Sequence, residues 1–321
     1  MLFEQIRKNK RNTVIIMGIF GGLIMLVGYF FAKSFSGGNP RELWKILLDW
    51  LLFVLLYIGF KYLTSMWTVL KMTKAQSVTE EQYPQLYHIV QDMALVAHIP
   101  MPKVYVIDDP CPNAFATGTS YQKAAVAVTT GLLQLMNREE LEGVIGHEVS
   151  HIRNYDIRVS TIAVALTALV MLIGTLLVGI GKWTFWGSAF LSDDRTDRKE
   201  GGGSLYIGIF GIFIWILGFL FLIIGVPVAE LLQFAVSRQR ESLADVSSVE
   251  LTRNPAGLIS AFRKLQKVDL QPKVNNSTVT GLYFYLPKVK GLAHLFDTHP
   301  PLEERIKRLE EIEFGKQLKR H

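Results

Sequence analysis

Long apolar stretches alternate with polar segments along this chain of 321 residues. Four of them, at residues 12–32, 43–63, 159–181 and 204–229, are long enough for a helix that crosses a hydrocarbon core of about 30 Å. Helices buried in soluble cores rarely exceed about 14 apolar residues. The first stretch is also too long for a signal peptide, and no small-residue cleavage site follows it. The pattern therefore predicts about four transmembrane helices arranged as two hairpins.

Basic residues indicate how these hairpins are oriented. They precede the first predicted span and follow the second and the fourth, whereas the two opposite loops carry both basic and acidic residues. By the positive-inside rule, both termini and both long polar segments face the cytoplasm of a multi-pass plasma membrane protein. The basic residues used are Arg7, Lys8, Lys10, Arg11, Lys71, Lys74, Arg238 and Arg240.

The polar segments have the composition of a globular domain with helices and a small sheet. Helical spacing of apolar residues predicts a helix over 79–99 that is capped by Thr79, and alternation predicts strands. Asn137, with Glu140 three residues later, has the spacing of a capping box at the start of another helix. The strands are expected at 103–107 and 123–133, and the segment PNAFATG at 112–118 precedes the second of them.

The domain organisation follows from this alternation of spans and polar segments. We expect an N-terminal transmembrane hairpin at 1–72, half of a globular domain at 73–158, a second hairpin at 159–229 and the other half of that domain at 230–321. The fold class is therefore a mainly α membrane protein with an α+β cytosolic domain. That domain carries a small sheet, and an exposed edge strand of such a sheet can take a peptide as an added strand.

Composition narrows the possible functions. Half of the residues are hydrophobic and the mean hydropathy is +0.26, which is too apolar for a soluble enzyme of this size. The net charge of +6 fits basic residues beside membrane spans, and no motif for nucleic acid accompanies it. The single cysteine, Cys111, excludes an intramolecular disulfide and a metal site built from cysteines.

The sequence HEVSH at residues 147–151 carries the chemistry. His147 and His151 are four residues apart, so in a helix both side chains project from one face and can bind one Zn²⁺. Glu148 is placed to reach a water on that metal, which is the H-E-x-x-H arrangement of zinc hydrolases with glutamate as general base. Two solvated surface histidines are the alternative.

A catalytic zinc site needs a third protein ligand, and RESLAD at residues 240–245 offers one. Glu241 and Asp245 are again four residues apart on a helical face. Glu241 can supply a carboxylate ligand, while Asp245 can accept the N–H of a ligating histidine and fix its tautomer. A solvated helical acid is the alternative for Glu241, and HEVSH makes that alternative the weaker one.

Four motifs in order carry a family resemblance. HEVSH followed by Asp156, RESLAD after a transmembrane hairpin, PNAFATG at 112–118 and THPPLEER at 298–305 resemble the membrane-embedded gluzincins. That family includes the HtpX type of heat-shock protease and the type I CAAX prenyl protease. The resemblance covers nearly the whole chain, which is most similar to the HtpX type, and it implies a zincin-like catalytic domain.

The resemblance implies a role for each matching residue. His147, His151 and Glu241 would bind one zinc ion per chain, Glu148 would be the base, and Asp245 would orient a ligand, most naturally His147. Asn113 and Ala114 would bind the substrate backbone, although a plain turn before the second strand is the alternative there. His299 and Arg305 would support the transition state or bind substrate, although a capped turn is the alternative. Asp156 would brace the motif helix or cap its end.

The implied function is a membrane-integrated zinc endopeptidase that hydrolyses peptide bonds by a zinc-bound water activated by Glu148. Its expected partners are the lipid bilayer and substrates that are damaged membrane proteins or unfolded proteins, with no nucleic acid. Membrane protein quality control is the implied role. Two alternatives stay open, a dedicated CAAX-type or signal-fragment processing peptidase, and a non-enzymatic membrane scaffold with structural zinc.

Overall fold

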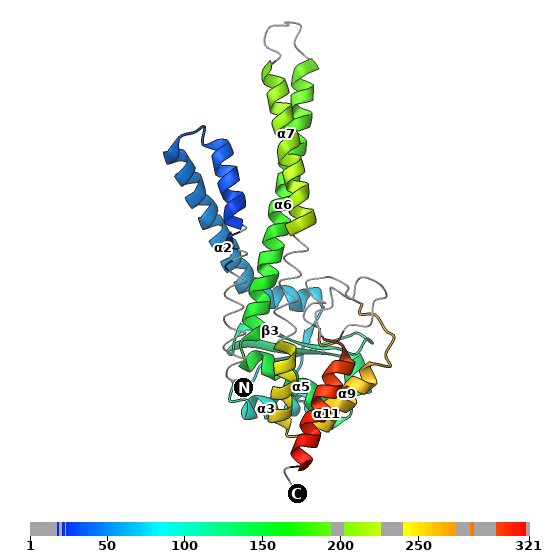
Figure 1. The fold of residues 1–321 in the computed structure, drawn as a ribbon. Helices are drawn as coiled ribbons and strands as arrows, with labels where there is room; N and C mark the ends of the chain where they lie inside the picture. Colours follow the sequence, from blue (N-terminus) through cyan, green and yellow to red (C-terminus); the bar gives the residue numbers. More distant parts are fainter. Residues whose placement is uncertain are drawn as a thin grey trace. The chain divides into compact units, whose positions relative to one another are not determined.

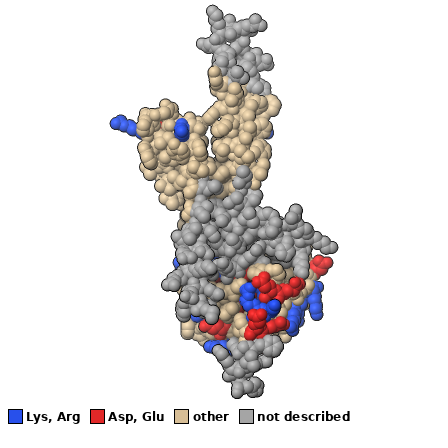
Figure 2. Space-filling model, viewed as in Figure 1, with Lys and Arg blue, Asp and Glu red and all other residues tan. Residues whose placement is uncertain are grey.

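The computed structural model describes residues 18, 21–22, 24–193, 202–225, 240–273, 283–285 and 300–318. The chain divides into two compact units. The first contains residues 59–162 and the described residues after 233. The second contains the described residues within 16–58 and 163–232. Figure 1 shows the ribbon coloured along the sequence, and Figure 2 shows the charged side chains on one face.

Long apolar helices account for the predicted spans. They are α2 (Pro40–Met72), α6 (Asp156–Asp193) and α7 (Gly202–Leu220), which continues into the π-helical turn η1 (Phe221–Gly225). Among the described residues, three segments are long and apolar enough to span a membrane, at Pro40–Phe60, Ala168–Ser188 and Tyr206–Ile223. The predicted first span is described only in part, with an apolar helix at Ile24–Phe35. The structure therefore supports three of the four expected spans.

Glycines let α6 and α7 approach each other closely within the second unit. A Cβ atom added at Gly181 would lie 2.3 Å from the backbone nitrogen of Trp215, and one at Gly211 would lie 2.6 Å from that of Phe185. Such contacts leave no room for a side chain at either position. Small residues that allow backbones to meet are a common basis for helix pairing in membranes.

The sheet of the first unit has four strands, β1 (Gln76–Ser77), β2 (Lys103–Ile107), β3 (Ala114–Ser120) and β4 (Lys123–Thr129). The spatial order is β1-β2-β4-β3, with β2 parallel to β4 and the other two pairs antiparallel. β3 therefore forms one edge of the sheet. Ala114, for which a plain turn was the alternative reading, begins this edge strand, and Asn113 directly precedes it.

Two predicted boundaries are wrong, and turn chemistry explains both. The helix predicted at 79–99 is α3 (Pro84–Val96), because Pro84 occupies its first turn and disfavours helical geometry in the residue before it. Thr79 belongs to the preceding turn and does not cap the helix. The strand predicted at 123–133 ends at Thr129, whose side chain caps α4 (Thr130–Leu135) by accepting the N–H of Leu132.

Three further helices pack in the first unit and hold the site residues. They are α5 (Arg138–Arg153), α9 (Pro255–Leu265) and α11 (Leu302–Leu318), together with helical residues 240–252. α5 and α9 are in close contact, because a Cβ atom at Gly143 would lie 2.9 Å from the backbone nitrogen of Leu258. Ser248 donates a hydrogen bond of 2.7 Å to the carbonyl of the same glycine. The bond from Ser248 connects the HEVSH helix directly to the helix that carries Glu241.

Candidate metal centre and active site

The HEVSH helix α5 begins at the predicted capping box, which the structure confirms. The Asn137 side chain accepts the N–H of Glu140 at 2.9 Å, and the Glu140 carboxylate accepts the N–H of Asn137 at 2.8 Å. Lys264 and Ser260 of α9 also bind this carboxylate, each at 2.6 Å. Burial alone would raise the pKa of Glu140, but these hydrogen bonds lower it. The start of α5 is therefore anchored to α9 by an ionised side chain.

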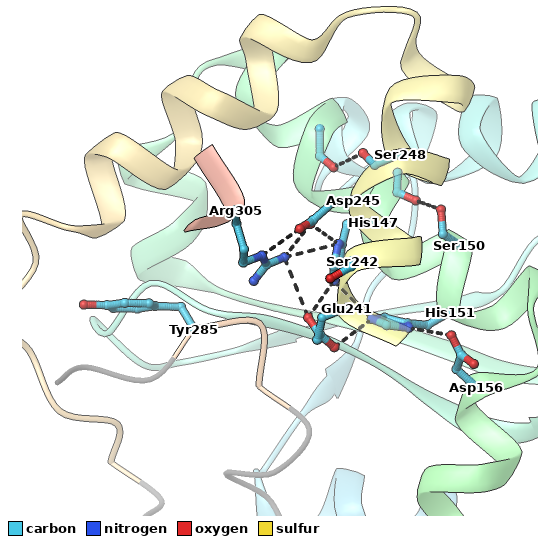
Figure 3. A network of polar contacts seen from close by, with 12 residues as sticks. His147, Ser150, His151, Asp156, Glu241, Ser242, Asp245, Ser248, Tyr285 and Arg305 are labelled. Carbon is cyan, nitrogen blue, oxygen red and sulfur yellow. Dashed lines mark hydrogen bonds and ion pairs between the residues drawn. The ribbon is translucent and has the colours of Figure 1, made fainter. Parts of the chain in front are cut away.

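His147, His151 and Glu241 meet at one point between α5 and helical residues 240–252 (Figure 3). The two Nε2 atoms are 3.0 Å apart, and the Glu241 oxygens lie 3.4 Å from each of them. One ligand atom from each residue falls within 4.8 Å of the others. The structure thus brings together the three residues expected to bind the metal.

Each histidine has a carboxylate on its other ring nitrogen. Nδ1 of His147 lies 3.0 Å from Asp245, and Nδ1 of His151 lies 3.1 Å from Asp156. A carboxylate in this place accepts the N–H of a neutral imidazole, which leaves Nε2 with its lone pair free. Asp245 therefore contacts the histidine expected for it, and Asp156, expected at the end of the motif helix, contacts the second one.

This arrangement of atoms fits a cation. With both Nδ1 atoms donating, two nitrogen lone pairs and a carboxylate point at the same small volume. Such acceptors repel one another unless a positive charge lies between them. Two imidazoles and one carboxylate form the three-ligand set of catalytic zinc sites, which keep a further position open. Among the residues that the structure describes, three ligands gather at this point, and they fit a zinc ion.

Arg305 of α11 holds Asp245 in place. Its guanidinium binds both oxygens of this carboxylate, at 2.9 and 2.6 Å, and is completely buried. The guanidinium also lies 4.2 Å from the centre of the Phe262 ring. Burial alone would raise the pKa of Asp245, but the charge of Arg305 lowers it. Arg305 thus contacts the residue behind His147, and its expected contact with substrate stays a prediction.

Asp156 owes its position to a break between two helices. α5 ends at Arg153 and α6 starts at Asp156, with Tyr155 between them in the left-handed region at φ 62°. The ring of Tyr155 packs against that of Tyr121 at a centroid distance of 4.3 Å. Because the chain turns here instead of continuing as one helix, Asp156 faces back toward His151.

Glu148 is buried between the two ligand histidines and β3. The backbone N–H of Ala116 on β3 is near enough to its carboxyl group to lower the pKa of that group slightly. Burial raises the pKa of Glu148, the charge of Glu241 adds to this effect, and the nearby histidines and the Ala116 N–H oppose it. A carboxyl group with a raised pKa is suited to taking up and returning a proton near neutral pH.

The free edge of β3 is already occupied near the site, which corrects the expectation of an exposed edge strand. The N–H of Phe284 donates to the carbonyl of Ala114 at 2.8 Å. The Asn113 side chain accepts the N–H of Tyr285 at 3.1 Å and donates to its carbonyl at 2.6 Å. Asn113 and Ala114 therefore bind backbone groups, in this structure those of the same chain.

The predicted site residue His299 lies outside the described part of the chain. Other contacts of the site were not predicted from the sequence. The aromatic residues around His147 were not foreseen, although the ring of Phe284 lies 5.0 Å from the imidazole and stacks on that of Phe262 at 5.4 Å. The run Tyr-Phe-Tyr at 283–285 is unusual in a polar segment and was the available signal.

The part of the chain that carries these site residues is similar to known proteins. The model of peptidase family M48 matches residues 80–313. "Protease HtpX homolog" proteins of Streptococcus mutans and Limosilactobacillus fermentum are 49% and 47% identical to this chain, each over 97% of it and 100% of their own length.

A solved structure extends the likeness to the fold. The crystal structure of S. mikatae Ste24p is similar at a TM-score of 0.50 and 18% identity, covering 96% of this chain and 67% of that one. This level of identity speaks to the fold alone. The family match and the near-full-length relatives together show that this chain belongs to peptidase family M48, the HtpX-type metalloproteases.

Proposed function

We propose that this chain is a membrane-integrated zinc-dependent endopeptidase in which Glu148 is the general base. The observation that carries the proposal is the convergence of two imidazole nitrogens and the Glu241 carboxylate, with Glu148 buried beside them. A zinc ion bound there would polarise the scissile carbonyl and make water acidic enough to deprotonate near neutral pH. The residues of the chain supply the rest of the chemistry.

Each protein group has a separate task in the proposed reaction. Asp245 and Asp156 hold the two imidazoles in the tautomer that directs Nε2 into the site. The carboxylate of Glu148 takes the proton from the attacking water and returns it to the nitrogen of the leaving amine. The nearby N–H of Ala116 on β3 favours the ionised form of that carboxyl group.

The proposed substrates are loops and tails of membrane proteins, and unfolded proteins, at the cytoplasmic face of the plasma membrane. Apolar helices that can span a bilayer precede both segments that carry the site, which would keep the enzyme at the membrane. Main-chain binding to a strand edge accepts many sequences, as damaged proteins require. The curated relatives bear the name of a protease, which agrees with hydrolysis of peptide bonds.

The first test replaces Glu148 by glutamine in protein purified in detergent and reloaded with zinc. We expect Glu148→Gln to lower cleavage of β-casein, an unfolded protein, by about 10²–10⁴-fold, because the base is lost. Zinc content should stay near one per chain, because the ligands remain. Glu142→Gln is the matched control, since Glu142 lies on the same helix and forms an ion pair with the exposed Arg138.

The outcomes separate the alternatives. Cleavage by wild type alone supports the proposed mechanism. Zinc binding by both proteins without cleavage by either would favour the scaffold with structural zinc. A Glu148→Gln protein as active as wild type would remove Glu148 from the mechanism.

Orientation has its own test. Ser77 is exposed on β1, and the protein's own cysteine is buried. In intact cells, a maleimide that cannot cross membranes should fail to label Ser77→Cys, and labelling should appear after the membrane is permeabilised. Labelling of intact cells would place the catalytic unit on the outer side.

A further inference from the structure

Residues 283–285 are bound to the free edge of β3 beside the proposed zinc site. Three hydrogen bonds connect this segment to Asn113 and Ala114, at 2.8, 3.1 and 2.6 Å. The Asn113 side-chain oxygen also accepts the N–H of Ala114 at 3.1 Å. The hydrogen-bonding groups that Asn113 and the Ala114 carbonyl could offer to a peptide are therefore already in use.

The side chains of the segment fill space on both faces of β3. Phe284 lies on the side of the metal ligands, with its ring against His147, Phe262 and the guanidinium of Arg305. Tyr283 lies against Phe115, at a ring distance of 5.8 Å, in a separate apolar cluster. Their exposed fractions are 1% and 2%, so both rings are held as core residues are.

We propose that residues 283–285 are an internal occupant of the substrate site, which a peptide substrate must displace from β3 before cleavage. The proposal rests on the proposed function and adds how access to that site is controlled. A substrate paired with β3 would need the Ala114 carbonyl and the Asn113 amide, which the segment now holds. The segment and a peptide substrate therefore cannot bind these groups at the same time.

Two consequences follow from competition for the same groups. The apparent affinity for substrate is the intrinsic affinity multiplied by the fraction of molecules in which the segment is released from β3. A bound substrate would also occupy the space that the Phe284 ring vacates, which is lined by His147, Phe262 and Arg305. An aromatic side chain of the substrate would therefore fit this place best.

Hydrogen exchange measures displacement without altering the segment. Zinc-loaded Glu148→Gln protein in detergent is compared with and without β-casein, which it should bind but not cleave. We expect the amides of Phe284 and Tyr285 to exchange about tenfold faster when β-casein is present, because they lose their partners on β3. Exchange that is unchanged or slower would overturn the proposal, since the segment would then be a permanent wall of the site.

A crosslink provides an independent test. In a Cys111→Ala background, Phe115→Cys and Tyr283→Cys together place two thiols on the face of β3 away from the metal ligands. Oxidation should abolish cleavage of β-casein by locking the segment in place, and reduction should restore it. The two single cysteine variants control for effects of the oxidant. Full activity of the crosslinked protein, or failure of the thiols to pair, would contradict the proposal.

Failure of this proposal can be told from failure of the proposed function. If wild type cleaves β-casein but exchange at Phe284 does not respond, only the internal occupant is disproved. If zinc-loaded wild type cleaves nothing, the proposed function fails and this proposal with it.

Discussion

The two histidines of the site are supported in different ways. Behind His147 lie Asp245 and then Arg305, both fully buried and joined by two hydrogen bonds. Behind His151 lies Asp156, the first residue of α6, and both are less deeply buried, with side chains 15% and 12% exposed respectively. One histidine thus depends on a charge pair inside the domain. The other depends on the start of a helix that continues into a predicted membrane span.

The two histidine–carboxylate contacts are therefore similar in geometry but differ in what stabilises the carboxylate. A buried carboxylate is stable only with its countercharge, so Asp245 and Arg305 form a unit in which neither can be spared. Asp156 is less deeply buried than Asp245, so we expect its replacement to cost less. We therefore expect the His147 side to set the stability of the site, and the His151 side to connect it to α6.

Removing Arg305 should produce the largest effect. Arg305→Met leaves Asp245 as a buried charge without its partner, which costs about 3–5 kcal/mol of unfolding free energy. Thermal unfolding in detergent measures the loss. Arg263→Met is the matched control, because Arg263 makes a surface ion pair with Glu310 and should cost at most about 1 kcal/mol. Equal losses in the two variants would contradict the distinction between the two sides.

Replacing each supporting carboxylate compares the two sides directly. Asp245→Asn and Asp156→Asn should weaken zinc binding by about 10–100-fold, because an amide orients the imidazole less well. The effect should be larger for Asp245, which is more deeply buried. Competition with a fluorescent chelator measures both affinities. A larger loss for Asp156 would reverse the comparison.

Zinc binding should depend on pH. Burial alone would lower the pKa of His151, but hydrogen bonds to Asp156 and Glu241 raise it to about 10 in the metal-free protein. Zinc requires the neutral ring, so below this pH binding releases a proton, and affinity should rise about tenfold per pH unit for each proton released. Titration calorimetry in buffers of different ionisation heat measures the release. A heat that is the same in all buffers would contradict it.

The same pKa shift has a consequence for stability in the absence of metal. Protonated His151 stabilises the fold fully below its unfolded pKa, about 6.5. As the pH rises toward 10, this contribution is lost. Unfolding of the metal-free protein should therefore become easier between these pH values, while the zinc-loaded protein shows no such loss from His151.

The smallest predicted effect concerns the end of α5. The Tyr121 hydroxyl donates to the carbonyl of Arg153 at 2.9 Å, next to the break before α6. Tyr121→Phe should cost about 0.5–1.5 kcal/mol of unfolding free energy, the usual contribution of one hydrogen bond. Zinc affinity should stay unchanged, because neither ligand nor its carboxylate is touched. A clear loss of zinc affinity would mean that this bond positions His151.

Local patterns predicted the elements that carry the chemistry. The capping box at Asn137 and the spacing of HEVSH depend only on neighbouring residues, so the start of α5 could be read directly. Contacts between distant parts could not. Asp156 turns toward His151 because Tyr155 adopts a left-handed conformation, which periodicity does not reveal. Likewise, nothing in the spacing of 283–285 announces that it binds β3, because sheet pairing joins residues far apart in sequence.

The order of residues along the chain determines when each part of the site is synthesised. His147 and Arg305, whose side chains approach within 3.4 Å, are separated by 158 residues. At 5–20 residues per second, a ribosome needs roughly 8–30 s to make the intervening segment. During that time the HEVSH helix exists without the residues that complete its support. The site therefore cannot be completed until Glu241 and Arg305, which follow α6 and α7 in the sequence, have also been synthesised.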